Sequence, residues 1–119
     1  ISLMKEARPE LHASSIQIET LGLQFDAGPE AFIDTAAVMA HLDLVVTSDT
    51  SIAHLAGALG RPTWLALKHV PDWRWLMHSE RSPWYPTMRL FRQTERGDWG
   101  PVFEGVAACL KDRMVLLSQ

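Results

Sequence analysis

Residues 43–62, DLVVTSDTSIAHLAGALGRP, constrain the fold more than any other part of the chain. An apolar run at 44–46 enters a turn of small polar residues at 48–51, where a short helix is expected to begin. A glycine and a proline end that helix, and the apolar segment 63–67 predicts a second strand. The expected buried face of the helix consists of Ile52, Leu55, Ala56 and Leu59. The stretch therefore predicts a β-α-β unit.

The start of this helix is a candidate anion site. Its first amides have no intrahelical partner, the helix dipole favours an anion there, and open α/β sheets bind ligands at the carboxyl ends of strands. In one interpretation, Ser48 or Asp49 merely caps the helix. In the other, the hydroxyls of Thr50 and Ser51 and the free amides hold a diphosphate. Asp49 would then accept hydrogen bonds from sugar hydroxyls or from the loop, because it would repel a phosphate.

His54 lies one turn into the expected helix and off its apolar face. It is either a structural histidine or a donor to a ribose or phosphate. The other four histidines show no ligand spacing with His54 or with Cys109, so no metal is expected. Cys109 reads as a buried, inert thiol within the last helix.

The connection at 68–86 is long and rich in aromatic residues, and connections of more than about 12 residues in a compact domain are usually functional or disordered. Its aromatic side chains either form a small additional core or make a wall that stacks on a sugar or base. The candidate substrate contacts in this loop are Asp72, Trp73, Arg74 and Trp75. Four other arginines, which we expect at the surface, are Arg61, Arg81, Arg89 and Arg92.

The rest of the chain predicts further elements of the same kind. Strands are expected at 1–4 and 87–91, a weaker strand within 16–25, and a turn at 26–30. Asp34 is the expected cap of a helix at 35–42, with Ala36, Met39, Ala40 and Leu42 facing inward. Asp98 is the expected cap of a final helix whose apolar stripe is Trp99, Val102, Phe103, Val106 and Leu110. This alternation predicts an α/β, Rossmann-like parallel sheet flanked by helices, as a single domain at 1–119.

Composition excludes several classes of function. With 119 residues, a formal charge of −3 and a pI near 5.9, the chain is not a general nucleic-acid binder. One cysteine permits no intrachain disulfide and favours a reducing, cytoplasmic location. No apolar run approaches about 18 residues, so no membrane span is expected. Dinucleotide-binding and Walker glycine patterns are absent. The chain starts on the strand-like ISLM, so we expect it to be cut from a longer protein.

The segment SDTSIAHLAGALGRP, followed by VPDWRWL and SPWYPTMRLFRQ, closely resembles the C-terminal part of bacterial glycosyltransferases of the heptosyltransferase-like family, family nine. The pattern D-T-x-x-x-H-x-A-x-A-x-G-x-P is met by Asp49, Thr50, His54, Ala56, Ala58, Gly60 and Pro62. The DWRW and SPWYP pieces match the branch found in tetratricopeptide-repeat proteins. ISLMKE and GDWGPVFEGVAACL resemble that family's second strand of the nucleotide-binding domain and its last helix, so the similarity covers nearly the whole chain.

This resemblance implies a GT-B architecture, in which two Rossmann-like domains enclose the active site and the C-terminal domain holds a nucleoside-diphosphate sugar, usually without a metal. Thr50 and Ser51 would meet the donor diphosphate, and Asp49 and His54 would lie beside the sugar or ribose. The family commonly has glycine where Ser51 stands, which lets the backbone approach the phosphates closely. The acceptor domain, which supplies the catalytic base in this family, is not in these residues, so no catalytic residue is named.

Three hypotheses follow. The first is the donor-binding part of an inverting glycosyltransferase, incomplete for catalysis by itself and completed by an N-terminal acceptor domain of the same chain. The second is a non-catalytic scaffold or protein-interaction module with the same fold, which predicts an exposed patch around Trp73, Trp75 and Trp84. The third, a small α/β nucleotide binder complete in itself, is disfavoured by the abrupt start of the chain.

Overall fold

The computed structural model describes residues 19, 21, 32–70, 75–76 and 79–117. The chain divides into two compact units, Ile1–His41 and Leu42–Gln119. Each unit is described by itself, and the single domain at 1–119 stays a prediction. The strand expected at 1–4, the weaker strand within 16–25 and the turn at 26–30 lie outside the described residues.

The first unit contributes one described helix, α2 (Ile33–Met39). The residue that precedes it, Phe32, has a left-handed backbone with φ 67° and forms no side-chain cap. The prediction that Asp34 caps the helix is wrong, because the helix begins one residue before it. Asp34 lies instead in the first turn, where its charge is favourable to the helix dipole. The buried residues of α2 are Thr35 and Met39, whereas Ala40 is exposed.

The second unit is built on a three-stranded sheet of β1 (Val45–Ser48), β2 (Thr63–Leu67) and β3 (Met88–Arg92). The order is β1-β2-β3 and both pairings are parallel. The strand expected at 63–67 is confirmed, and the other two lie within two residues of their expected bounds at either end. The α/β, Rossmann-like fold with a parallel sheet flanked by helices is therefore confirmed.

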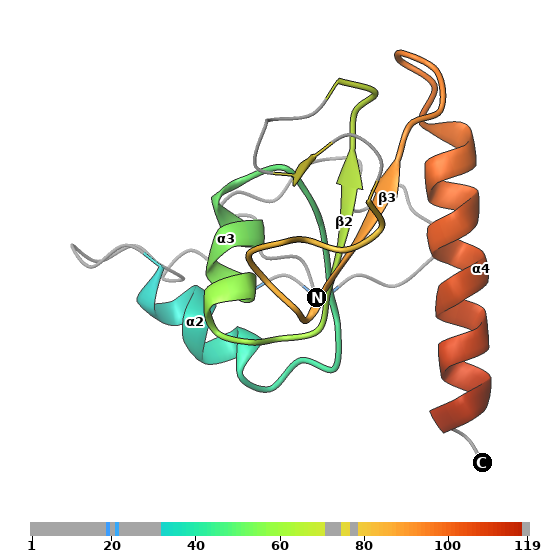
Figure 1. Ribbon diagram of the computed structural model, residues 1–119. Helices are drawn as coiled ribbons and strands as arrows, with labels where there is room; N and C mark the ends of the chain where they lie inside the picture. Colours follow the sequence, from blue (N-terminus) through green and yellow to red (C-terminus); the bar gives the residue numbers. More distant parts are fainter. Residues whose placement is uncertain (1–18, 20, 22–31, 71–74, 77–78, 118–119) are drawn as a thin grey trace. The chain divides into compact units, whose positions relative to one another are not determined.

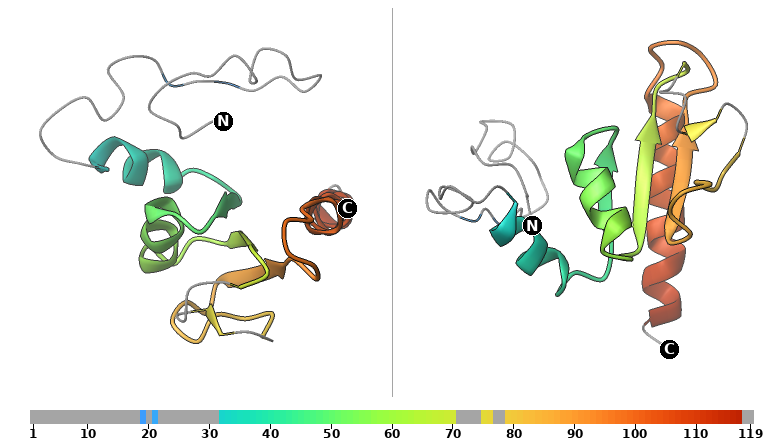
Figure 2. Two further views of the ribbon diagram at one scale, coloured as in Figure 1. Left: turned by 90° about the horizontal axis from the view of Figure 1, so that it is seen from above. Right: turned by 60° about the vertical axis from the view of Figure 1, so that its left-hand side comes forward.

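Helices α3 (Ser51–Ala58) and α4 (Gly100–Leu117) cover opposite faces of this sheet (Figures 1 and 2). Helix α3 contacts β1 and β2, whereas α4 contacts β2 and β3. Successive side chains of a strand point to opposite faces, so each face of fully buried β2 supplies one of two apolar layers.

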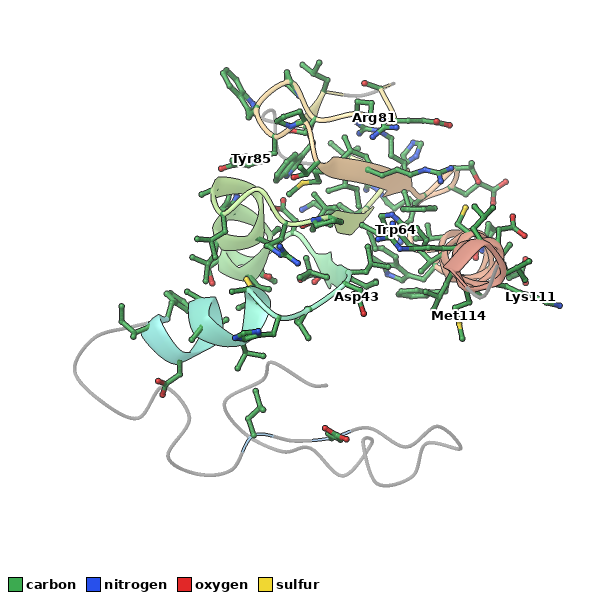
Figure 3. All side chains as sticks on the ribbon, turned by 90° about the horizontal axis from the view of Figure 1, so that it is seen from below. Asp43, Trp64, Arg81, Tyr85, Lys111 and Met114 are labelled. Atoms are coloured by element: carbon green, nitrogen blue, oxygen red, sulfur yellow. The ribbon has the colours of Figure 1, made fainter. Side chains whose placement is uncertain are left out.

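The layer on the α3 side is the main core of the unit. It consists of Ala53, Leu65, Leu67, Trp75, Met88 and Leu90, with Tyr85 packed against them. The layer on the α4 side joins the rings of Trp64 and Phe91, whose centroids are 5.5 Å apart, to the buried Val102 and Val106 of α4. Figure 3 shows Trp64 on the α4 side of the sheet and Tyr85 beside α3.

The end of α3 follows from a single glycine. Gly60 has φ 68°, a left-handed conformation that favours glycine. Its amide donates to the carbonyl of Gly57 at 3.0 Å, and the amide of Arg61 donates to that of Ala56 at 3.0 Å. These two bonds form a Schellman motif, which satisfies carbonyls that the helix end would leave unpaired. The expected stop of the helix at Gly60 is confirmed.

The described residues of the connection from β2 to β3 contain no α-helix, and its Trp75 and Tyr85 pack in the core on the α3 side of the sheet. The amide of Leu90 donates to the carbonyl of Glu80 at 2.8 Å, and Arg81 forms an isolated antiparallel bridge with Arg89. The loop therefore pairs with the outer edge of β3, and its Trp75 and Tyr85 fill space that a crossover helix commonly occupies.

Candidate functional site

The turn between β1 and α3 lies at the carboxyl end of β1, as the sequence predicts. Thr50 is the residue that precedes the helix, with φ −138° and ψ 174°, so the interpretation that Ser48 or Asp49 caps α3 is wrong. The Thr50 hydroxyl forms no capping bond and instead lies 3.3 Å from the Thr47 hydroxyl and 3.4 Å from the carbonyl of Ser48. Asp49, Thr50 and Ser51 are exposed. The start of α3 is therefore open to solvent and not covered by a cap side chain.

His54 is held by the aromatic loop rather than by its own helix. Its Nδ1 lies 3.3 Å from the hydroxyl of Tyr85, and its ring stacks on Trp75 with centroids 5.2 Å apart and planes inclined by 26°. The imidazole is partly buried in this position. His54 can thus be both a structural residue and a hydrogen-bond donor to a ligand, because the contacts with Tyr85 and Trp75 also fix the orientation of its ring.

The candidate substrate contacts of the loop divide into two groups. Asp72, Trp73 and Arg74 lie outside the described residues. The side chain of Trp75 is fully buried, and its Nε1 has no hydrogen-bond partner among the described residues. Trp84, by contrast, is 57% exposed. The position of Trp75 matches the interpretation of the loop as additional core, because the ring is fully buried in the apolar core and stacks on His54, which leaves no exposed surface for a ligand.

The buried face of α3 differs from the expected one. Ala53, Ala56 and Gly57 are buried, whereas Leu59 is 46% exposed. The reason is Tyr85, because a Cβ at Gly57 would lie 2.5 Å from Cγ of that ring. The helix thus turns its smallest residues toward the loop, which a pattern of large apolar residues does not reveal.

Two arginines expected at the surface are structural. The Arg92 guanidinium donates to the carbonyls of Ser79 at 2.8 Å and Leu76 at 2.6 Å, and also to that of Trp75. Burial lowers the pKa of Arg92. Arg61 donates in the same way to the carbonyl of Leu42. Arg92 thereby fastens the loop that carries Trp75 to the end of β3.

Two hollows lie along the carboxyl edge of the sheet and share Trp99. The first, of about 360 Å³, adjoins the β1–α3 turn and is lined by Val46, Thr47, Ser48, Ala66, Trp99 and Phe103. The second, of about 530 Å³, lies between the segments that follow β2 and β3, and its polar lining includes Lys68, His69, Gln93 and Arg96. These four residues were not predicted from the sequence. Each of them follows the end of β2 or β3 within a few residues. Because ligands of α/β sheets bind at the carboxyl ends of strands, a search after β2 and β3 as well as β1 would have identified them.

Among the residues that the structure describes, no three histidine, cysteine, aspartate or glutamate side chains gather where they could hold a metal ion. Cys109 is a free thiol of intermediate exposure rather than the fully buried one expected. None of the described helices combines the length and the apolar character needed to cross a membrane.

Comparisons with known proteins bear on the same part of the chain. Residues 25–67 match the sequence profile of glycosyltransferase family 9 (heptosyltransferase), and this range contains Asp49, Thr50, Ser51 and His54. Over 106 residues the chain is 35% identical to protein FlbA of Caulobacter vibrioides, an alignment that covers 89% of this chain and 17% of FlbA. The chain thus spans about a sixth of the length of this curated relative. No solved structure matches. The two matches support the resemblance to the heptosyltransferase-like family.

Proposed function

We propose that this chain is the donor-binding part of a glycosyltransferase and that it holds the diphosphate of a nucleoside-diphosphate sugar at the start of α3. The observation that carries the proposal is the open β1–α3 turn, in which Thr50 and Ser51 are exposed and no side chain caps the helix. Amides and hydroxyls at such a position suit an anion, because the helix dipole favours negative charge there and open α/β sheets bind ligands at the carboxyl ends of strands.

The neighbouring groups fit the rest of such a ligand. Asp49 is exposed beside the turn and would accept hydrogen bonds from sugar hydroxyls. His54, oriented by Tyr85, would donate to a ribose or to a phosphate oxygen. The apolar hollow of about 360 Å³ next to Ser48 could take an apolar part of the ligand such as the base. No metal is required in this proposal, because helix amides would stabilise the departing nucleoside diphosphate.

The proposal also covers the whole protein to which this chain would belong. We place the chain in the C-terminal domain of a GT-B enzyme, in the branch that carries tetratricopeptide repeats, in the cytoplasm of a bacterium. Group transfer needs acceptor, base and donor held together, so an N-terminal acceptor domain of the same chain would complete the site. Residues 1–119 alone would bind the donor without transferring its sugar.

Titration of the 119-residue chain with ADP, UDP and GDP, followed by backbone amide NMR, tests this proposal. Shifts of amides between Ser48 and His54 at millimolar nucleotide are the expected result. Thr50→Val should weaken the response because it removes a hydroxyl at nearly constant shape, whereas Thr94→Val, in an exposed segment after β3, should leave nucleoside diphosphate binding unchanged. No shift in any amide of the β1–α3 turn would refute the proposal.

The alternative of a non-catalytic interaction module receives mixed support. It requires exposed tryptophans on the loop, and Trp84 meets this condition. Trp75 does not, since it is buried under the chain's own residues. The absence of any response to nucleotide, together with binding of a protein partner that Trp84→Ser abolishes, would favour this alternative.

A further inference from the structure

The hollow of about 530 Å³ at the carboxyl edge of β2 and β3 adjoins the donor site proposed above and shares only Trp99 with the hollow offered to the base. It is lined by Lys68, His69 and Val70 from the segment after β2 and by Gln93, Arg96, Gly97 and Trp99 from the segment after β3. Figure 1 shows both segments at the upper end of the sheet, next to the start of α4. None of the residues named for the donor diphosphate lines this hollow.

Gln93 is the residue that joins the two segments. Its side-chain oxygen Oε1 accepts hydrogen bonds from the amide of His69 at 3.0 Å and from the amide of Gly97 at 3.1 Å. Two N–H donors fix which end of the side-chain amide is the oxygen. The backbone carbonyl of Gln93 lies 3.3 Å from Nδ1 of His69, so that nitrogen is the donor and the ring is oriented as well.

These contacts use only the oxygen of the Gln93 side-chain amide. Gln93 is only 5% exposed, and its NH₂ group forms no hydrogen bond with a described residue. The nitrogen Nε2 is not among the fully buried side-chain atoms that lack a partner, so it remains accessible to solvent. Since Gln93 lines the hollow, an acceptor atom held there would satisfy this donor.

The charge of the lining indicates what kind of acceptor fits. Lys68 and Arg96 line the hollow and no aspartate or glutamate among the described residues does. Neither side chain forms a hydrogen bond or ion pair with another described residue. Asp98, the nearest acid to Gly97 in this segment, accepts a hydrogen bond from the amide of Gly100 at 3.2 Å. Among the described residues, the hollow therefore combines two cations and one side-chain amide donor that have no protein partner, a set that is suited to an anion.

We propose that this hollow is a second anion-binding site, which takes the phosphate or carboxylate group of a small molecule. The Gln93 amide donates one hydrogen bond to an oxygen of the anion, and Lys68 and Arg96 neutralise its charge. Trp99 forms an apolar wall against the remainder of the ligand. The inference does not depend on the identity of the donor nucleotide, because its polar contacts, Lys68, Gln93 and Arg96, are not among the residues assigned to the donor.

Titration with inorganic phosphate and, separately, with acetate tests the inference, with sodium chloride at equal ionic strength as the reference. The side-chain NH₂ signal of Gln93 and the amides of His69 and Gly97 are expected to shift and saturate with phosphate or with acetate. Whichever anion binds more tightly identifies the ligand group. A response to neither, or an equal response to chloride, overturns the inference.

Three variants sharpen this test. Gln93→Glu keeps two acceptor oxygens for the amides of His69 and Gly97 but lacks the donor, so it should remain folded and lose anion binding. Lys68→Met should weaken binding about tenfold or less, in the range of one lost charge-assisted hydrogen bond. The matched control is Lys111→Met on α4, on the side away from the sheet (Figure 3), which should bind as the parent chain does. Unchanged phosphate binding by Gln93→Glu would overturn the inference.

The two proposals can fail separately. If nucleotide shifts only the amide signals of residues 48–54 and phosphate does not shift the Gln93 signal, the donor site is supported and the second anion site is refuted. Phosphate shifts at Gln93 without any nucleotide response of the β1–α3 turn would do the reverse.

Discussion

The ring of Tyr85 packs directly over Gly57, so closely that a Cβ at residue 57 would lie 2.5–2.8 Å from three atoms of that ring. The same tyrosine points its hydroxyl at Nδ1 of His54, 3.3 Å away. One loop residue therefore fixes both the face that α3 buries and the orientation of the histidine beside the candidate donor site. Tyr85 thus contacts α3 twice, with its ring at Gly57 and with its hydroxyl at His54, and each contact can be tested separately.

Gly57→Ala should destabilise the chain by about 1–3 kcal/mol, because the added methyl group overpacks a filled space. Gly105→Ala in α4 is the matched control. Its Cβ would meet only Phe91 at 3.8 Å, an ordinary contact, so it should stabilise the chain by about 0.5–1 kcal/mol through helix propensity. Chemical denaturation measures both. If the penalty at Gly57 persists in a Tyr85→Ala background, Tyr85 is not its cause.

Tyr85→Phe should leave the fold nearly unchanged and weaken nucleoside diphosphate binding about two- to fivefold, the effect of one modest hydrogen bond. The reason is that the lost hydroxyl no longer orients His54. Calorimetric titration of a double-mutant cycle provides the check. In a His54→Ala background, Tyr85→Phe should have no further effect on affinity. An equal loss in both backgrounds would contradict the positioning role.

Thr63 and Thr87 should respond in opposite ways to replacement by valine. The buried hydroxyl of Thr63 donates to the carbonyl of Arg61 at 2.9 Å, so Thr63→Val should destabilise the chain by about 1 kcal/mol. The Thr87 hydroxyl is buried without a partner among the described residues, so Thr87→Val should stabilise it by about 1 kcal/mol. Thermal unfolding of the two variants measures the difference, and shifts of the same sign would count against this account.

Arg92→Met should cost about 2–3 kcal/mol, because it leaves the carbonyls of Trp75, Leu76 and Ser79 without their charged donor. Arg92→Lys should recover part of the loss, since an ammonium cannot reproduce the planar fork. Arg113 forms one exposed bond, to the carbonyl of Asp43 at 3.1 Å, and Arg113→Met should change stability by about 0.5 kcal/mol or less. Denaturant midpoints rank the three variants. Equal losses at the two arginines would show that Arg92 does not fasten the loop.

Local chemistry made much of this fold predictable. The apolar segment 63–67 coincides with β2, and Gly60 ends α3 through its left-handed backbone. Alternation of strands and helices predicted the parallel sheet, since such connections must cross over. The capping assigned to Asp34 is wrong because α2 begins after Phe32 without a side-chain cap, so the polar residue that usually marks a helix start lies inside the first turn.

The sequence by itself determined the β-α-β unit and the turn at Asp49, Thr50 and Ser51, because hydrophobic period and helix-end signals act between near neighbours. Only the tertiary structure decided which face of α3 is buried, where the ring of His54 is held and which polar groups meet at Gln93. Those outcomes depend on the packing of side chains that are distant in sequence, and packing selects for shape and space rather than for local pattern. A glycine that admits a distant tyrosine is the clearest case.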